Sequence, residues 1–556
     1  MKLLLCVWMV LFWSMAAPGQ QPADLILTQT KVWTASAALP WAEALAISGS
    51  RIIAVGTEAE ISKHRVPKTL VLENPGPLVV PGFIDNHTHF LEGGFQLLSI
   101  DLRTARNETQ FAERIRQTAE TFPAGRWITG GNWDHEAWPG AKLPTRQSID
   151  GFTGNTPVFV SRLDGHMALA NGVALKKADI TKSTPDPPGG TIVRDPQTGE
   201  PTGILKDAAM SLVSRHIPEP TPLEQDEALR RALKEAGRYG VTSIQDITNW
   251  PTYETFQRAH QQNQLTLRIY SRTPLAQWEK QADWIKKQGA GDNWLRLGGF
   301  KAFMDGSLGS STAYFFDPYS DDPSTSGLLS EQAIPESKLR QHMLAADKAG
   351  LQLSIHAIGD RANHLLLNLF EEVARINGPR DRRFRIEHAQ HLRREDIPRF
   401  AKLGVIASMQ PYHCIDDGRW AEKRIGPERI KTTYAFRSLL GAGARLTFGS
   451  DWNVAPLNPL LGIYAAVTRR TLDDRNPTGW VPEEKITVEE ALRSYTINNA
   501  FASFDESKSG SIEVGKRADL VVLDRDIFNI PPGTIAQARV QYTIVDGKIV
   551  YRAGPR

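Results

Sequence analysis

Residues 78–89 of the chain read LVVPGFIDNHTH, an apolar run that passes into a carboxylate and two histidines. His87 and His89 lie two positions apart, and side chains with this spacing on a β-strand point to the same face. Two imidazoles on one face at the end of a strand suit a single divalent cation. The question is whether other strands end at the same place.

Short apolar runs of this kind recur through the middle of the chain, and charged, helix-like stretches separate most of them. Eight runs are found, at residues 78–84, 241–245, 267–271, 297–304, 351–356, 384–388, 405–409 and 445–450. Strands that alternate with helices predict parallel βα units. Eight such units predict an α/β fold in which residues 80–507 form a (β/α)8 TIM barrel.

The two ends of the chain have a different pattern. Short strand-like segments, punctuated by glycine or proline, lie at residues 25–27, 44–47, 51–55, 69–72, 518–523, 540–545 and 548–551. We expect residues 22–79 and 508–556 to meet in one small β-sandwich domain. The gap between the first two barrel runs is too long for one helix, which predicts an insertion at about residues 100–220, part of it a lid or rim over the site.

Composition places the chain among globular proteins. Of its 556 residues 41% are hydrophobic and 23% are charged, and the mean hydropathy is −0.33, which excludes a disordered chain and a multi-span membrane protein. The net charge is only +3 and there is no basic block, so nucleic acid is not an expected partner. The sequence carries no signal for the oligomeric state.

The first residues predict a targeting segment. Lys2 precedes a charge-free apolar run at residues 3–15, and small residues near Ala17 are followed by Pro18. This pattern predicts a signal peptide over residues 1–17 and a periplasmic or secreted protein. The run is shorter than the about 20 residues of a bilayer span, so we expect no stable membrane span after cleavage; an uncleaved anchor is the alternative.

Chemically active side chains end several of the predicted barrel strands. His356 ends the fifth run, His388 ends the sixth, and Asp451 follows the eighth. Because the active groups of such barrels gather where the strands end, we expect these three to join His87 and His89 around a divalent cation. Taken alone, the paired histidines are compatible with two unrelated side chains, but the other strand ends favour a metal site.

For three side chains, Lys301, Asp451 and Cys414, the sequence allows two interpretations each. Lys301 lies inside the fourth run, where burial lowers a lysine pKa; its amine either reacts with carbon dioxide to give a carbamate that bridges two cations, or pairs as an ammonium with Asp305. Asp451 either moves a proton between activated water and the leaving group or plays a plain hydrogen-bonding role. Cys414 is the one cysteine beyond the signal segment, and it is either a nucleophile or a buried thiol, the commoner case.

Several longer motifs resemble the amidohydrolase superfamily of metal-dependent hydrolases, and within it the amidohydrolase 3 group, which includes N-substituted formamide deformylase. They are PGFIDNHTH at 81–89, GNWD at 131–134, DGHMA at 164–168, FKAFMDGSLGS at 300–310, GSD at 449–451 and GKRADLVVL at 515–523. Together they cover nearly the whole chain after the signal segment. Each motif alone is unspecific, whereas their combination is specific.

The resemblance implies a ligand set and an activity. Six positions match the pattern without departure: the first-strand ligands His87 and His89, the carboxylated bridging lysine Lys301, the fifth- and sixth-strand ligands His356 and His388, and the eighth-strand ligand and general base Asp451. The family holds one or two divalent ions, most often zinc. It hydrolyses the C–N bond of an amide or cyclic amide, so the resemblance implies a small-molecule amide substrate.

Candidate substrate contacts follow from their place in the chain. Those in the insertion, near the expected lid, are Trp133, Asp134, Arg162, Asp164 and His166. His166 is also a candidate catalytic residue, which either polarises a substrate carbonyl or stabilises its own loop. Ser307 lies in a Gly- and Ser-rich stretch after the fourth run and Tyr412 follows the seventh, so both are candidate pocket residues, although aromatic side chains here suit a core equally well.

Two other functions fit the same residues. An esterase, lactonase or phosphotriesterase would use the same activated water with a different pocket, and a panel of amide and ester substrates separates these possibilities. A secreted binding protein without turnover would not need Asp451, so the presence of this residue beside a complete ligand set disfavours that function.

Overall fold

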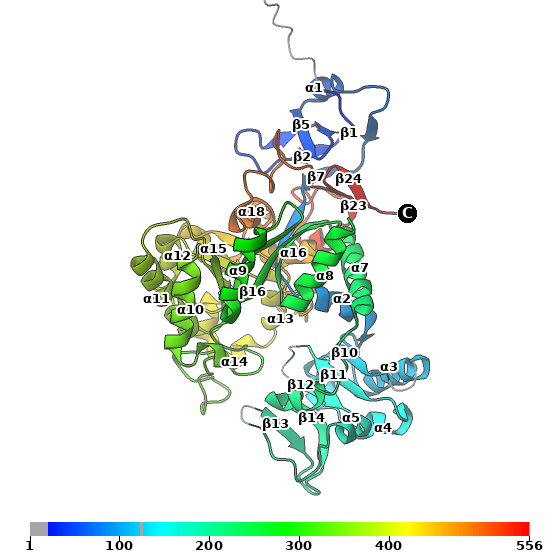
Figure 1. The fold of residues 1–556 in the computed structure, drawn as a ribbon, viewed down its shortest axis with the longest axis vertical. Coiled ribbons are helices and arrows are strands. Elements are labelled where there is room, and N and C mark those ends of the chain that lie inside the picture. The colour runs from blue at the N-terminus through cyan, green and yellow to red at the C-terminus, as the bar shows by residue number, and fades with distance from the viewer. Residues whose placement is uncertain (1–20, 123–125, 164, 166, 188–189, 555–556) are drawn as a thin grey trace, which may run out of the picture.

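The computed structural model describes residues 21–122, 126–163, 165, 167–187 and 190–554. At its centre a sheet of eight parallel strands curls into a nearly closed barrel, which confirms the predicted (β/α)8 fold (Figure 1). Around the barrel the strands follow the order of the sequence: β8 (Phe83–Thr88), β15 (Val241–Ile247), β16 (Arg268–Pro274), β17 (Leu295–Phe303), β18 (Gln352–Ala357), β19 (Arg385–His388), β20 (Ile406–Met409) and β21 (Leu446–Phe448). A parallel bridge from Thr88 to Trp452 lies at the seam, where the first and last strands approach.

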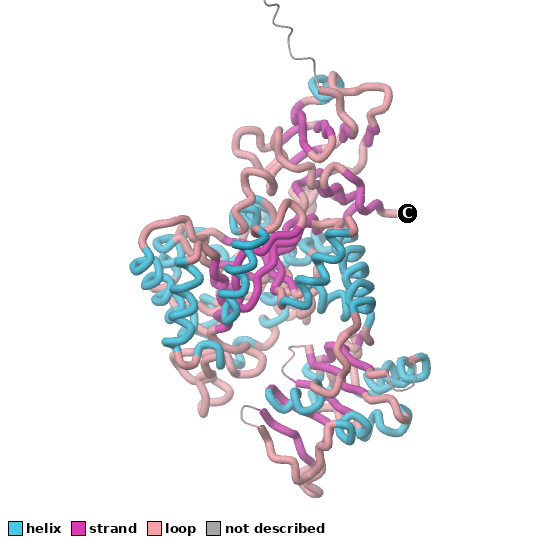
Figure 2. The backbone as a smooth tube through the Cα atoms, viewed as in Figure 1, coloured by secondary structure: helices cyan, strands magenta, loops and turns pink. Residues whose placement is uncertain are grey.

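Helices surround the barrel strands (Figure 2). α7 (Pro222–Arg238) shows why they form: Thr221 and Glu224 make a capping box at its start, and Leu229 and Leu233, four positions apart, pack in the barrel core. The others are α2 (Phe90–Leu98), α8 (Trp250–Gln261), α9 (Trp278–Gln288), α10 (Glu336–Lys348), α11 (Asp360–Asn377), α12 (Ile397–Leu403), α13 (Pro411–Asp417), α14 (Ala421–Arg429), α15 (Phe436–Gly441), α16 (Pro459–Thr468), α17 (Val488–Ser494) and α18 (Ile497–Ala502).

Two smaller sheets form a β-domain at one end of the molecule (Figure 1). One sheet is N-terminal, with the order β5 (Arg51–Gly56), β4 (Ala44–Ser48), β1 (Leu25–Thr28) and β6 (Leu70–Glu73), and α1 (Glu58–Ser62) lies beside it. The other draws on both chain ends, with the order β24 (Lys548–Arg552), β23 (Val540–Val545), β22 (Leu520–Leu523), β7 (Leu78–Pro81), β2 (Lys31–Trp33) and β3 (Trp41–Ala42). Leu27 and Ile47 from the first sheet share a buried core with Val79 and Val522 from the second.

The first predicted barrel run is two strands rather than one. β7 ends at Pro81 and belongs to the β-domain, whereas β8 begins at Phe83 and belongs to the barrel. Proline lacks a backbone N–H and ends a ladder. At Gly82 an added Cβ would lie 2.2 Å from the hydroxyl oxygen of Thr242, so the chain needs glycine where it passes from one sheet to the other.

A further sheet lies between β8 and β15 in the sequence and at the opposite end of the molecule from the β-domain; we call it, with its helices, the insertion (Figure 1). Its strand order is β13 (Gly190–Arg194), β14 (Pro201–Asp207), β12 (Met167–Ala170), β11 (Val158–Arg162), β10 (Ile128–Trp133) and β9 (Ile100–Asp101). Its helices are α3 (Glu108–Thr121), α4 (Gln147–Thr153), α5 (Gly172–Lys177) and α6 (Ser211–Ser214).

The predicted signal peptide, residues 1–17, lies outside the described residues. Within the ranges that the structure describes, no helix combines the length and apolar character that crossing a membrane requires.

Candidate metal centre

Three side chains from the barrel seam meet at the mouth of the barrel. His89 Nε2 lies 3.3 Å from Asp451 Oδ1, and His87 Nε2 lies 3.5 Å from the same oxygen. A tetrahedral ion held about 2.1 Å from each donor separates the donors by about 3.4 Å, close to both distances. The three donors are therefore spaced for one divalent cation before any ion binds.

The backbone at the seam holds these ligands in place. Asp85 is fully buried, and its Oδ1 accepts the N–H groups of His87 at 3.1 Å and of Ser450 at 2.9 Å. The N–H of Asp451 donates to the His87 carbonyl at 2.7 Å. Asp451 has a φ of +58°, a left-handed conformation that is uncommon for residues with a side chain. These hydrogen bonds maintain the strained backbone that aims the carboxylate at the histidines.

A chain of buried charges orients the His87 ring. Its Nδ1 lies 2.5 Å from Glu387 Oε2, and the other oxygen of Glu387 binds the Arg272 guanidinium. Burial alone would raise the pKa of Glu387, but Arg272 and His87 hold it well below its usual range. Burial and the nearby Lys301 lower the pKa of His87 to about 4. The ring is thus neutral, with its N–H facing Glu387 and the Nε2 lone pair facing the site.

Lys301 reaches the same place from β17. Its Nζ lies 3.3 Å from His87 Nε2, and burial lowers the pKa of Lys301 to about 8. A large fraction of the amine is therefore neutral near pH 8, the form that reacts as a nucleophile. Asp305, the alternative ammonium partner, accepts backbone N–H groups of Tyr314, Ile358 and Gly359.

Two more strands contribute histidines. His356, on β18, and His388, at the end of β19, have ring centroids 4.5 Å apart, and the ring of His388 lies 4.9 Å from that of His87. Burial lowers the pKa of His356 to about 3 and that of His388 well below its usual range, so both offer lone pairs. His388 has a φ of +74°, which turns its ring toward the pocket at the point where the strand ends.

Orphaned polar atoms test whether a cation fits here. Within the described part of the chain, the buried atoms His388 Nδ1 and Asp451 Oδ1 have no hydrogen-bond partner. Donor atoms of His388 and Asp451 lie within 4.8 Å of each other. Burial of polar atoms without hydrogen-bond partners costs free energy, and bonds to a metal ion offset this cost. The unpaired nitrogen and carboxylate oxygen gathered here therefore suit a divalent cation.

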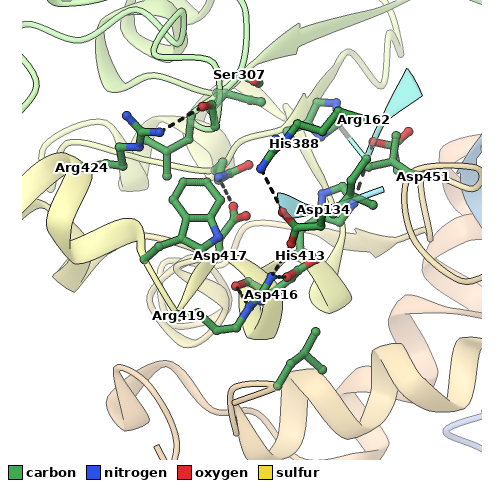
Figure 3. Close-up of a pocket in the computed structure, with 18 of the residues that line it drawn as sticks. Asp134, Arg162, Ser307, His388, His413, Asp416, Asp417, Arg419, Arg424 and Asp451 are labelled. Atoms are coloured by element: carbon green, nitrogen blue, oxygen red, sulfur yellow. Dashed lines mark hydrogen bonds and ion pairs between the residues drawn. The ribbon is translucent and has the colours of Figure 1, made fainter. Parts of the chain in front are cut away.

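The ligands open into a cavity of about 670 Å³ at the mouth of the barrel, which we call the pocket (Figure 3). Asp134, Arg162 and Ser307, three of the predicted substrate contacts, line it. Arg162 pairs with Asp134 at 3.2 Å, and Arg419 from the barrel lies 3.9 Å from the same carboxylate. The insertion thus forms part of the pocket wall, and a volume of this size suits a small molecule.

Among the described residues, two of the predicted substrate contacts, Trp133 and Tyr412, do not line the pocket. Trp133 is a core residue of the insertion rather than a substrate contact, because it is fully buried and its Nε1 donates to the carbonyl of Val160 at 2.9 Å. Tyr412, on α13, is not among the described residues that surround the pocket. Asp164 and His166 lie outside the described residues. Cys414 is buried and its thiol pKa is raised to about 11, so the buried-thiol interpretation holds.

Sequence reasoning missed Glu387 and Arg272 as parts of this centre, and it places His413 only within a stretch after the seventh strand that could line the pocket. The signal for Glu387 was its alternation with Arg385 on an apolar strand: charged side chains at i and i+2 share the barrel interior and need buried partners. Arg272 continues the third run by one residue. His413 stands in the first turn of a helix, where no strand periodicity marks it.

Comparison with known proteins agrees with this geometry. Residues 75–551 match the model of the amidohydrolase family. The chain is 40% identical to Protein LONG AFTER FAR-RED 3 of Arabidopsis thaliana, over 97% of this chain and 94% of that protein, and 31% identical to N-substituted formamide deformylase of Arthrobacter pascens, over 96% and 99%. An uncharacterized metal-dependent hydrolase from Pyrococcus horikoshii has a similar crystal structure, with a TM-score of 0.75 and 29% identity over 92% of this chain and 99% of that one. The chain therefore belongs to the amidohydrolase family.

Proposed function

We propose that the protein hydrolyses the C–N bond of a small N-acyl amide in the pocket. The reaction would use one or two divalent cations, and zinc is the metal that we propose. The observation that carries the proposal is the spacing of His87, His89 and Asp451, with 3.3 and 3.5 Å between donors drawn from the first and eighth strands. The side chains that would hold the ions are His87, His89, Lys301, His356, His388 and Asp451.

Family membership and the relatives support the reaction class. As a member of the amidohydrolase family, the protein is a metal-dependent hydrolase of carbon–nitrogen bonds other than peptide bonds. The relative named N-substituted formamide deformylase supports an acylated amine as the substrate, and the pocket volume of about 670 Å³ accommodates one.

Different side chains of the protein would transfer the proton and orient the substrate. A divalent cation held by these side chains would lower the pKa of a bound water molecule and polarise a carbonyl oxygen. Asp451 directs Oδ1 at His87 and His89, which leaves Oδ2 to take a proton from the attacking water and return it to the leaving nitrogen. Arg162 and Ser307 line the pocket and are placed to orient the amide.

Carboxylation of Lys301 would complete a two-ion site. In this step the Nζ lone pair bonds to the carbon of carbon dioxide and one N–H proton is released, which leaves a carbamate with two oxygen donors. Its support is a buried amine with a pKa of about 8, placed 3.3 Å from His87. Native mass spectrometry tests the step: an added mass of one carbon dioxide is expected in the wild-type protein and not in Lys301→Met.

The test of the function is a substrate panel with metal analysis. We expect zinc-loaded protein to hydrolyse 4-nitroanilides of formic and acetic acid faster than an uncatalysed control. Asp451→Asn should lower kcat by about 10²–10⁴-fold, and elemental analysis shows whether the variant keeps its metal. Hydrolysis of the matching 4-nitrophenyl esters without any amide turnover would contradict the proposal in favour of an esterase.

A further inference from the structure

Of the described histidines that line the pocket, only His413 is outside the proposed ligand set. It stands in the first turn of α13, directly after β20, and its side chain lines the pocket. Its Nε2 is buried and, among the residues that the structure describes, has no hydrogen-bond partner. A buried imidazole nitrogen without a partner is costly, and it is maintained where it serves a ligand.

The distance from His413 to Asp451 shows whether His413 is placed to bind the same metal ion as Asp451 or to contact a substrate. His413 Nε2 lies 4.0 Å from Asp451 Oδ2, the oxygen that points away from His87 and His89. This distance is wider than the about 3.4 Å between donors of one tetrahedral ion. It is also too long for a direct hydrogen bond. Two groups at this separation can instead each contact a different atom of one small molecule that lies beside both of them.

The helix holds His413 rigidly. Pro411 begins α13, the N–H of His413 donates to the Gln410 carbonyl at 3.1 Å, and the next two residues, Cys414 and Ile415, are buried. A donor fixed before the substrate arrives needs no reorganisation during the reaction, which is the condition under which a hydrogen bond stabilises a transition state most.

We propose that His413 is a catalytic residue whose Nε2–H donates to the substrate carbonyl oxygen as that oxygen becomes an oxyanion, beside the Asp451 Oδ2 that handles the proton. The inference rests on the proposed amide hydrolysis. No covalent bond to His413 forms: the carbonyl carbon gains the water oxygen, the C–N bond then breaks, and the proton passes through Asp451 to the leaving nitrogen.

The test compares His413→Leu, which removes the donor, with His413→Gln, which keeps an N–H donor on a chain of similar reach. His364→Gln is the matched control, because His364 pairs with Asp396 and does not line the pocket. With the 4-nitroanilide panel we expect His413→Leu to lower kcat by about 10²–10³-fold with little change in KM. His413→Gln should recover part of kcat, and His364→Gln should match the wild type.

Two readouts besides turnover make the test decisive. A methylphosphonamidate analogue of the anilide mimics the tetrahedral state, and its inhibition constant should rise in His413→Leu by about the factor that kcat loses. Metal content by elemental analysis should equal that of the wild type. Loss of an ion in either His413 variant would make His413 a ligand and overturn the proposal, as would a folded His413→Leu with wild-type kcat. A wild-type protein that binds zinc and cleaves none of the amides would overturn the proposed function itself.

Discussion

His87 owes its orientation to Glu387, and Glu387 owes its ionised state to Arg272. All three side chains are fully buried, so none exchanges its partner for water. Carboxylates that support ligand histidines fix the tautomer and raise the basicity of the ligand nitrogen. The properties of the metal centre therefore depend on two side chains that do not reach the cation.

Replacement of Glu387 by Gln tests this dependence. We expect zinc affinity to fall by about 10–100-fold, because an amide no longer selects the His87 tautomer. Folding stability should also fall, by about 3–5 kcal/mol, because the Arg272 charge is left buried without a partner. Zinc titration calorimetry and urea denaturation measure the two effects.

The double variant Arg272→Met with Glu387→Leu is the control for Glu387→Gln. Removing both charges should restore stability toward the wild type, whereas zinc affinity should stay low. A single variant with unchanged zinc affinity would show that Glu387 has only a structural role.

At the residue scale, the sequence carries a usable signal where a strand ends. His356, His388 and Asp451 could be placed together because parallel strands of a barrel end at one rim. Glu387 and Arg272 could not, because their pairing is 115 positions apart in the chain and depends on which side chains face inward. The left-handed backbone at Asp451 has no sequence signature either.

At the level of elements, β8 and β21 approach each other closely at the seam of the barrel. Gly449 follows β21, and a Cβ there would lie 2.5 Å from Asn86 Oδ1, 2.6 Å from the His87 nitrogen and 2.7 Å from Asp85 Oδ1. All three residues are fully buried, and the His87 nitrogen and Asp85 Oδ1 cannot move apart without loss of the hydrogen bond between them. The absence of a side chain thus lets the last strand approach the first.

Gly449→Ala should therefore impair both stability and metal binding. Overpacking of this kind costs about 1–3 kcal/mol, and displacement of the His87 backbone should weaken zinc binding in parallel. Gly441→Ala is the matched control, because a Cβ at Gly441, in α15, meets nothing within 4 Å and alanine suits a helix better. Equal melting temperatures and zinc affinities for the two variants would contradict the prediction.

At the scale of elements, the sequence predicts that a strand is present more readily than it predicts which sheet the strand joins. Residues 78–84 look like one apolar run, yet Pro81 and Gly82 divide it between two sheets. Both residues were visible in the sequence, but an apolar strand of either sheet has the same composition, so periodicity alone cannot assign it. The steric conflict with Thr242 that explains Gly82 exists only in three dimensions.

At the scale of the whole molecule, Arg268 joins the barrel to the β-domain. It lies on β16, and its guanidinium binds Asp519 at 2.7 and 3.0 Å and Asp546 at 2.9 Å. Asp519 immediately precedes β22, and both acids come from the C-terminal part of the β-domain. Because Arg268 and Asp519 are both buried, removal of one partner leaves the other charge in the interior without compensation.

Arg268→Met is expected to destabilise the protein by about 3–5 kcal/mol, since it leaves the Asp519 carboxylate buried without its partner. Arg230→Met, which removes an exposed ion pair with Glu227 on α7, should leave stability close to that of the wild type, because water screens exposed charges. Urea denaturation followed by circular dichroism measures both. Equal effects of the two substitutions would mean that the junction does not contribute to stability.

The pairing of β7 with β22 also bears on how the protein is made. Val79 faces Val522, so the ribosome adds about 440 residues between the two partners, which takes roughly 20 to 90 s at typical elongation rates. During that time the backbone N–H and C=O groups along one edge of residues 78–81 are unpaired, because the partner strand has not yet been translated. A nascent chain that stalls before residue 520 is left with this edge open to pairing with other chains, and aggregation of such fragments is the hazard that this topology creates.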